Sequence, residues 1–557
     1  MAQYPYRGSI DTASIPFTSR YCGRTIIQPQ LDQYQQANIG GGFQDITANK
    51  GIPEVFYIHD VMPTRQGVKS VAYQKVLQGL HGINTFDRIQ SVRDADDGIA
   101  FLGTTTDGRS FLISTFSPSW TEVTPAGAPS TSEISIANVT GQSYICYPNF
   151  GIFSVDPSLV KLVPASISWG STVNDNGVAL NNSMIISICD CYNFLLATDG
   201  FTIYNSSSTN PLDFDVSNGL ITGAQSQVPA DIQGNIVALV KLGLGFAVFT
   251  PTNTVSGQWS GNIKYPWVFR PIFNSGGTDS IVKVSKGGPD GSIYAYTNAG
   301  LQQLTVLKAE NVFSTLTDYL SSRFYEDWDD VNNIPYESQL SEDLKIRIQW
   351  TGNRYLTVSY GPQALEQAYV YDTNLKQWGK LRIPHVCTVD FIVRADGNRY
   401  AYSDLSGNSY SSLYSIAYDE LTSISQSPAS VKRTLGVLQS DGSLLIPVMD
   451  EYNFTANAVC LIGYYRLIRQ KLLTIQQINI ENIDNQSYDF KLSIISSQLD
   501  STLETVSSFS SYDIHVEGGS TVKAMYGYAV GLDHAILVQG SFSLISIEFW
   551  FTLDGNR

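Results

Sequence analysis

The sequence predicts a mainly all-β fold: a β-propeller of six or seven blades with an inserted helix, an extended N-terminal arm and a C-terminal β module. Apolar runs are joined by Asp-Gly pairs, which supply the positive φ angles of tight hairpin turns. Five of these pairs, between 107 and 442, follow one another at intervals of 92, 91, 106 and 45 residues. Such intervals approach multiples of roughly 45 residues, the length of one four-stranded blade. Residues that favour strands are abundant, with 32 tyrosines among them.

Residues 1–90 are expected to form an extended N-terminal arm or platform. The segment is rich in Gln, Tyr, Gly and Pro, as in IIQPQLDQYQQANIGGGFQDI, and shows few clear strands. We expect such a segment to be ordered by packing on other parts. It has neither the basic region nor the apolar stretch of a secretory signal. A Pro-led turn followed by a strand closes the arm at VMPTRQGVKSVAY (61–73).

Residues 91–450 hold the predicted propeller. Its Asp-Gly turns lie at 107–108, 199–200, 290–291, 396–397 and 441–442. Further strand pairs are expected at 143–164, 235–259, 344–360 and 367–384. The apolar stretch 234–251 is short and has Lys241 at its centre, so it predicts two buried strands and no membrane span. Tyr371-Asp372 leads to Trp378, a corner typical of blades in which the aromatic ring packs between neighbouring sheets.

One segment interrupts the β series. Residues 304–330 place Phe313, Leu316, Leu320 and Phe324 on one helical face, which predicts an amphipathic helix. An insertion there also explains why the interval from 290 to 396 is longer than two blades.

Residues 451–557 predict a separate β module. Apolar and polar residues alternate within 461–483, 488–498 and 535–553. That alternation is typical of a sandwich or small barrel with one buried face.

The chain shows no motif for catalysis, for a cofactor or for a metal, so no site residue of these kinds is predicted. The five histidines are isolated, and neither a P-loop nor a GxSxG elbow is present. The six cysteines are scattered, which predicts reduced, buried thiols from synthesis in a cytosol. Cys189 and Cys191 are expected on one side of a strand, where a metal would need two more ligands.

The acidic run Glu326, Asp327, Asp329 and Asp330 has three interpretations. It offers oxygen ligands of the kind that calcium prefers. It also offers carboxylates for a glycosidase pair. The third interpretation, a solvated helix end and loop, is favoured because the spacing fits no EF-hand pattern.

Charge limits the partners of the chain. The 557 residues carry a net charge of −16, and only 15% of them are charged. No Lys/Arg-rich stretch is present to neutralise phosphates, so tight non-specific DNA binding is not expected. A neutral, charge-poor surface is typical of proteins that bury large areas against partner subunits.

The order of segments resembles the tail nozzle proteins of short-tailed bacteriophages, also called tail tubular protein B or packaged-DNA stabilisation proteins. The resemblance extends along the whole chain. Its segments are MPTRQGVKS (62–70), NFLLATDGFTIYNSSSTNPLDFD (193–215), NIVALVKLGLGFAVFTPTNTV (235–255), VYDTNLKQWGKL (370–381) and SLISIEFWFTLDGNR (543–557).

This resemblance implies a structural protein of the virion tail and no enzyme. Six copies would form a ring below the portal and adaptor, next to tail fibre or spike proteins. Double-stranded DNA would be retained, and later ejected, through the lumen of the ring without sequence-specific binding. An acidic wall would keep DNA from adhering through like-charge repulsion. Neither the copy number nor the channel-lining residues follow from the sequence.

Two alternatives remain open from the sequence. A receptor- or glycan-binding propeller would use exposed Trp120, Trp259 or Trp267 as sugar platforms, whereas in a structural role these rings pack between blades. A propeller glycoside hydrolase would need a carboxylate pair about 5 to 9 Å apart at the axial mouth.

Overall fold

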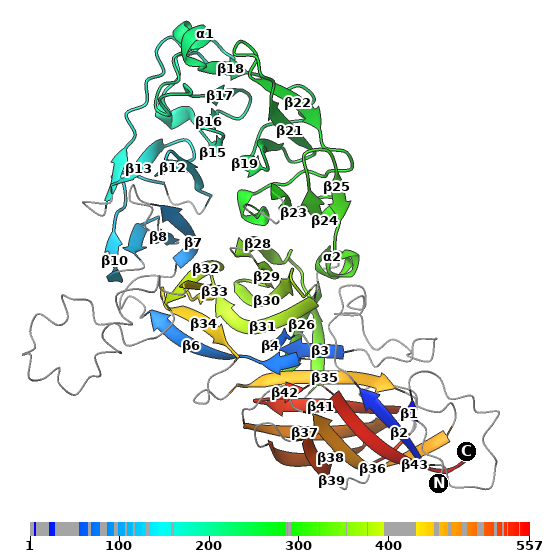
Figure 1. Cartoon of the computed structure of the whole chain (residues 1–557). Coiled ribbons are helices and arrows are strands. Elements are labelled where there is room, and N and C mark those ends of the chain that lie inside the picture. Colours follow the sequence, from blue (N-terminus) through cyan, green and yellow to red (C-terminus); the bar gives the residue numbers. More distant parts are fainter. Residues whose placement is uncertain are drawn as a thin grey trace, which may run out of the picture.

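The computed structural model of the chain is mostly β-sheet, which confirms the predicted all-β class (Figure 1). The structure describes residues 5–6, 22–27, 55–64, 68–77, 86–93, 99–105, 108–114, 117–129, 133–156, 161–285, 287, 291–321, 324–332, 334–351, 354–375, 377–394, 431–449, 456–465, 471–481, 487–497, 506–516, 521–525, 529–531, 533–544 and 546–556.

Four four-stranded sheets follow one another along the chain, and in each the consecutive strands pair antiparallel. Sheet 1 contains β7 (Phe86–Arg93), β8 (Ile99–Thr105), β9 (Ser110–Ser114) and β10 (Ser117–Glu122). Sheet 2 contains β11 (Ser135–Val139), β12 (Gln142–Tyr147), β13 (Gly151–Asp156) and β14 (Lys161–Pro164). Sheet 3 contains β15 (Ser187–Cys191), β16 (Phe194–Thr198), β17 (Ile203–Asn205) and β18 (Gln225–Gln227), with α1 (Gly219–Thr222) before the last strand. Sheet 4 contains β19 (Ala238–Leu242), β20 (Gly245–Phe249), β21 (Thr254–Trp259) and β22 (Trp267–Pro271).

Three further sheets continue the series, and two of them recruit strands from elsewhere in the chain. Sheet 5 contains β23 (Ile293–Thr297), β24 (Gly300–Leu304) and β25 (Ala309–Asn311), with an antiparallel bridge from Val284 to Ala295. Sheet 6 contains β28 (Lys345–Thr351), β29 (Tyr355–Gly361), β30 (Leu365–Asp372), β31 (Gln377–His385), β4 (Val61–Pro63), β5 (Val68–Ser70) and β42 (Ser543–Leu544). Sheet 7 contains β32 (Cys387–Arg394), β33 (Val431–Leu438), β34 (Leu444–Val448) and β6 (Ala72–Leu77).

Within the described residues, neighbouring sheets pack through their first strands at six places: β7 lies against β11, β11 against β15, β15 against β19, β23 against β28, β28 against β32 and β32 against β7. Sheets 4 and 5 share a hydrophobic cluster. Two serines join first strands directly: Ser135 Oγ accepts the Ile188 N–H (2.9 Å), and Ser187 Oγ accepts the Leu239 N–H (3.1 Å). Separate hydrophobic clusters fill the space between successive sheets, including the space between sheets 4 and 5 and that between sheets 5 and 6. Figure 1 shows the sheets following one another around a common centre.

Sheet 7 meets sheet 1 at a seam of aromatic rings. Phe86 packs on Trp120 with ring centroids 4.8 Å apart. The Trp120 indole N–H donates to the Gly442 carbonyl (3.3 Å), and the Phe86 N–H donates to the Ser440 carbonyl (2.9 Å). Residues more than 300 positions apart therefore form one packed contact.

The C-terminal residues form two more sheets, and the strands predicted at 461–483, 488–498 and 535–553 are confirmed (Figure 1). One sheet has the order β3 (Val55–His59), β35 (Ala458–Tyr465), β41 (Asp533–Gly540), β37 (Tyr488–Ser497) and β38 (Val506–Val516). The other contains β1 (Pro5–Tyr6), β2 (Cys22–Ile27), β43 (Ser546–Asn556), β36 (Lys471–Glu481), β39 (Thr521–Met525) and β40 (Ala529–Gly531).

The predicted hairpins are confirmed at three of the Asp-Gly turns. β8 pairs with β9, β16 with β17 and β33 with β34 on either side of 107–108, 199–200 and 441–442, while Asp107 itself lies outside the described residues. Gly291 has the expected positive φ of 72°, but its turn joins the Val284 bridge to β23 and no two full strands. The turn at 396–397 lies outside the described residues. The apolar stretch 234–251 is the hairpin β19–β20, as predicted.

The expected long helix over 304–330 is wrong. The helix there, α2, spans only Ser314–Ser321, and its Leu316 and Leu320 are buried as the pattern required. The acidic run that follows belongs to β26 (Phe324–Asp329), which pairs antiparallel with β27 (Ile334–Gln339). The aromatic residues of FYEDWD favour a pleated strand, and this local preference ends the helix.

The expected arm contains more strand than the sequence indicated. β3, β4, β5 and β6 all lie within residues 1–90, and each pairs with a strand of a distant segment. Strands therefore pair across the expected domain boundaries at 90 and 450, which stay predictions.

Candidate functional site

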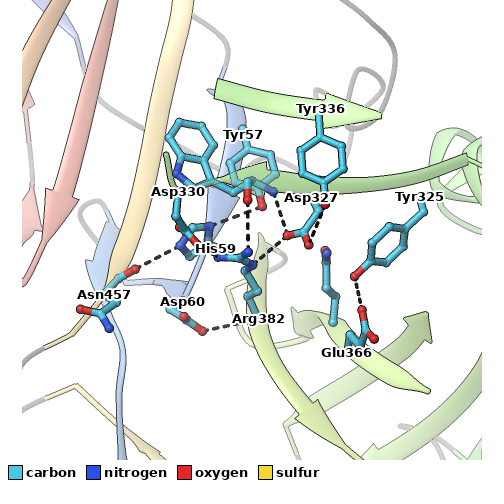
Figure 2. Close-up of polar contacts among 12 residues, drawn as sticks. Tyr57, His59, Asp60, Tyr325, Asp327, Asp330, Tyr336, Glu366, Arg382 and Asn457 are labelled. Carbon is cyan, nitrogen blue, oxygen red and sulfur yellow. Dashed lines mark hydrogen bonds and ion pairs between the residues drawn. The ribbon is translucent and has the colours of Figure 1, made fainter. Parts of the chain in front are cut away.

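A cleft lies where sheet 6 and the β26–β27 hairpin meet the C-terminal sheet that contains β3, β35 and β41. Its volume is about 700 Å³. Its lining residues come from six separate stretches of the chain: His59, Asp60, Tyr325, Asp327, Asp330, Glu366, Arg382, Pro384, Asn457, Ala458, Val459, Gln539 and Gly540. The polar groups among these residues are tied together by hydrogen bonds and ion pairs (Figure 2).

Arg382, on β31, is the centre of this network (Figure 2). Its Nε lies 2.7 Å from Asp327 Oδ1, and its Nη1 lies 3.2 Å from Asp330 Oδ2. Its Nη2 donates to the Trp328 carbonyl (3.1 Å). All three nitrogens are therefore engaged by the β26–β27 hairpin, and the charge-assisted bonds hold that hairpin on sheet 6.

Asp60 stands where the chain passes from the C-terminal sheet into sheet 6. It separates β3 from β4 and has a φ of 53°, a left-handed conformation that Asp and Asn tolerate better than most residues. Its Oδ1 accepts both the Tyr73 hydroxyl (2.5 Å) and the Arg382 N–H (2.9 Å). Burial raises the pKa of the Asp60 carboxyl to about 6, although the two donors and the cations of Arg382 and Lys380 act in the opposite direction.

His59 is held neutral beside Asp60. Its Nε2 donates to the Asn457 carbonyl (3.0 Å), so Nδ1 accepts, and the Tyr57 hydroxyl lies 3.4 Å away. Burial, together with the charges of Arg382 and Lys380, lowers the pKa of His59 to about 3. His59 therefore joins the C-terminal sheet to the cleft as an uncharged hydrogen-bonding group.

Trp328 anchors the hairpin in the C-terminal module. It is only 2% exposed and packs in one cluster with Val459, Leu461 and Leu537. Its ring stacks on Tyr57 with centroids 5.1 Å apart. Its indole N–H has no hydrogen-bond partner, which reduces the net stabilisation that its burial provides.

Tyr325 and Glu366 form a second polar contact of the cleft. The Tyr325 hydroxyl donates to Glu366 Oε2 at 2.5 Å. Burial and this carboxylate raise the pKa of Tyr325 well above its ordinary value. The phenol therefore stays protonated and acts as a donor at neutral pH.

The acidic run is a structural element of the cleft and not a helix end. Asp327 and Asp330 pair with Arg382, whereas Asp329 closes the hairpin turn by accepting the N–H groups of Val331 and Asn332. The side chain of Glu326 lies outside the described residues. Among the described residues, no three His, Cys, Asp or Glu side chains are grouped so that they could hold a metal ion.

The other residues singled out in the sequence are mostly buried. Cys189 and Cys191 lie in one hydrophobic cluster, as their spacing predicted, and Cys146, Cys387 and Cys460 are also buried free thiols. Trp120 and Trp267 are 6% and 1% exposed, so neither ring offers a face to a sugar. Trp259 is partly buried and stacks on Phe194. Trp378 is buried between sheets 5 and 6, as its corner motif predicted.

His385 is buried away from the cleft's polar network. Its Nδ1 donates to the Ile383 carbonyl (2.7 Å) and its Nε2 accepts from the Ser359 hydroxyl (2.8 Å). Burial lowers the pKa of His385 to about 4. Exposed His515 pairs with Asp489 (2.7 Å), while the side chains of His81 and His534 lie outside the described residues.

Sequence reasoning missed the cleft itself. His59, Asp60, Glu366 and Arg382 stand in no shared motif, and the fold alone brings them together. The one local signal was the acidic run of β26. Residue spacing cannot show that this run lies next to Arg382, which is more than 50 residues away. Chemically, the arrangement presents carboxylates, amides and a phenol toward a half-enclosed space, with one arginine already neutralised.

The comparisons with known proteins add no relative. No family model matches the chain, and no curated protein matches it. Among the described residues, no helix is both long and apolar enough to cross a membrane.

Proposed function

We propose that the chain is a structural subunit of the tail nozzle of a short-tailed bacteriophage. In this proposal it is not an enzyme. Six copies form a ring below the portal and adaptor, and the ring retains packaged DNA and conducts it during ejection. Tail fibre or spike proteins are its neighbours in the virion.

The observation that carries the proposal is the order in which the sheets pack. Each first strand contacts that of a neighbouring sheet, and β32 of the last sheet contacts β7 of the first. From this order we infer a β-propeller of seven blades, in which β6 supplies the outer strand of the seventh blade. A toroid of this kind is a rigid scaffold with short, protected edges. Such rigidity suits a subunit that forms the static wall of a channel.

Charge supports the proposal at the level of the assembly. The chain carries 50 acidic and 34 basic side chains, and it has no basic stretch. A lumen lined by such subunits repels the phosphate backbone, so DNA slides without adhering.

The chemistry of the cleft supports a structural role. Its arginine is fully paired, His59 is bonded to a backbone carbonyl and kept neutral, and Asp327 and Asp330 are engaged with Arg382. These groups join the β26–β27 hairpin to sheet 6 and β3 to β35, and none of the four is poised for proton transfer to a substrate.

The proposal is tested on particles whose genome encodes this chain. In electron micrographs, antibodies against the purified protein should label the tail, on the side of the portal that faces the tail tip. A DNA mobility assay at low salt should show no retention by the purified protein. Absence of the chain from purified tails, or tight binding to duplex DNA, would reject the nozzle assignment.

A further inference from the structure

The cleft carries more negative than positive charge. Four carboxyl groups line it, together with the single guanidinium of Arg382, and His59 is neutral. Buried Lys380 adds a second positive charge that acts on Asp60 and His59, and its Nζ lies 4.6 Å from the centroid of the Tyr57 ring. The four carboxyl groups outnumber these two cations. The residual charge therefore favours a cationic occupant.

Two of the four carboxyl groups keep an oxygen that accepts nothing. Asp60 receives both of its donors on Oδ1, and Glu366 receives the Tyr325 hydroxyl on Oε2. Within the part of the chain that the structure describes, no donor reaches Asp60 Oδ2 or Glu366 Oε1. Neither oxygen is among the fully buried atoms that lack a partner, so both are open to the solvent of the cleft. A ligand that brings N–H donors into the cleft can bond to them there.

We propose that the cleft binds a guanidinium group presented by an arginine side chain of a partner polypeptide. A guanidinium is always charged, is weakly hydrated, and directs five N–H donors in one plane, so it can bond to more than one acceptor at a time. The amide side chains of Asn457 and Gln539 and the phenol of Tyr325 line the same space. The volume of about 700 Å³ exceeds a guanidinium and suits a side chain with its flanking backbone. The proposal stands independently of the nozzle assignment.

The test uses the full chain and three small probes. Nα-acetyl-arginine methylamide is titrated into the protein and its binding followed by calorimetry, with a dissociation constant expected on the order of 1 mM. Nα-acetyl-lysine methylamide carries the same charge on a compact ammonium and is expected to bind several-fold more weakly. Nα,Nε-diacetyl-lysine methylamide, which carries no charge, is expected not to bind. These arms separate recognition of the guanidinium from simple attraction of cations.

Matched variants locate the site. Asp60→Asn and Glu366→Gln should each weaken binding of the arginine probe about tenfold or more, because each removes a charged acceptor. Asn tolerates the left-handed backbone at position 60 and keeps an acceptor for Tyr73, so the fold is retained. Glu310→Gln is the control, because Glu310 is an exposed carboxylate on β25 outside the cleft, paired with Lys308. It should bind like the wild type.

Three outcomes overturn the proposal. The first is no binding of the arginine probe at any soluble concentration. The second is binding that is unchanged in the Asp60→Asn, Glu366→Gln double variant. The third is equal binding of the lysine and arginine probes, which would replace guanidinium recognition with non-specific attraction of cations. A cooperative thermal unfolding transition well above the titration temperature in each variant ensures that a loss of binding reports the site and not the fold.

Discussion

At the scale of single residues, Asp60 shows how one side chain fixes the passage between two sheets. Its left-handed backbone ends β3 and starts β4 in another direction, and its carboxylate binds Tyr73 and Arg382 on sheets 7 and 6. Asp60 thus supplies both the left-handed backbone conformation and the hydrogen bonds. Different substitutions at this position separate the two contributions to stability.

We predict that Asp60→Ala lowers the free energy of unfolding by about 2–4 kcal/mol, because it adds left-handed strain and leaves two buried donors without an acceptor. Asp60→Asn keeps the backbone preference and one acceptor, and it should cost about 1 kcal/mol or less. Denaturant unfolding of both variants measures the difference. Equal losses in the two variants would contradict this role of Asp60.

The loss of stability on substitution of His59 is expected to depend on pH. Its pKa is about 3 in the folded chain and near 6.5 when unfolded, so between these values the unfolded chain binds more protons. The stabilisation that depends on neutral His59 is present above pH 6.5 and is lost as the pH falls toward 3. Asp60 acts in the opposite direction, because its raised pKa of about 6 favours the folded chain as the pH falls from 6 to 4.

We therefore predict that His59→Gln destabilises the protein at pH 7 and that the loss shrinks, or changes sign, at pH 4.5. The comparison of variant with wild type at each pH removes the contribution of His385, which is common to both chains. Urea midpoints at the two pH values provide the measurement. A pH-independent difference between the chains would show that His59 does not titrate on unfolding.

At the scale of elements, the β26–β27 hairpin joins sheet 6 to the C-terminal module through Trp328 and Arg382. We predict that Trp328→Ala costs about 3–5 kcal/mol, as for other buried large side chains. Trp328→Phe keeps an aromatic ring against Tyr57 and removes the unpaired indole N–H, so it should cost about 1–2 kcal/mol.

Hydrogen exchange supplies the readout for this hairpin. In Trp328→Ala the amides of β26 and β27 should exchange faster, while those of sheet 3, far from the hairpin, should keep their protection. Uniform acceleration across both regions would mean that Trp328 stabilises the fold as a whole and not this joint.

The seam between sheets 7 and 1 offers a second test at this scale. Gly442 has a φ of 80°, and a Cβ there would lie 2.7 Å from the Phe86 ring. Gly261 has the same φ of 80°, but a Cβ there would meet nothing within 4 Å. We predict that Gly442→Ala is more destabilising than Gly261→Ala by about 1–3 kcal/mol, because only the first adds overpacking to the backbone strain. Equal thermal shifts for the two variants would show that the seam is not tightly packed.

Elements with a local signal were predicted well. Asp-Gly turns, alternation within strands and the 234–251 hairpin depend on residues close in sequence, and these elements lie where the patterns placed them. The helix over 304–330 was too long because the aromatic residues of β26 also fit a helical period. The pairing of β6 with β34, and of β42 with β5, leaves no local trace because the partners lie hundreds of residues apart. The same distance hid the cleft, where His59 and Arg382 meet only after the chain has folded.

At the scale of the whole molecule, the sheets succeed one another along the chain, and β32 of sheet 7 contacts β7 of sheet 1. Sheets 6 and 7 include strands from the N-terminal residues, and sheet 6 also includes β42 from the C-terminal residues. Local sequence order therefore builds the individual sheets, while long-range pairing joins them into one scaffold. A scaffold joined in this way suits a subunit that carries load in an assembly, which is the role we propose.

Cryo-electron microscopy of the assembled protein tests that role most directly. The account predicts class averages with six-fold symmetry around an open lumen wider than duplex DNA, about 20 Å, each subunit showing seven sheets around its own centre. A monomer that persists at high concentration and in purified tails, or a ring whose lumen is too narrow for a duplex, would contradict it.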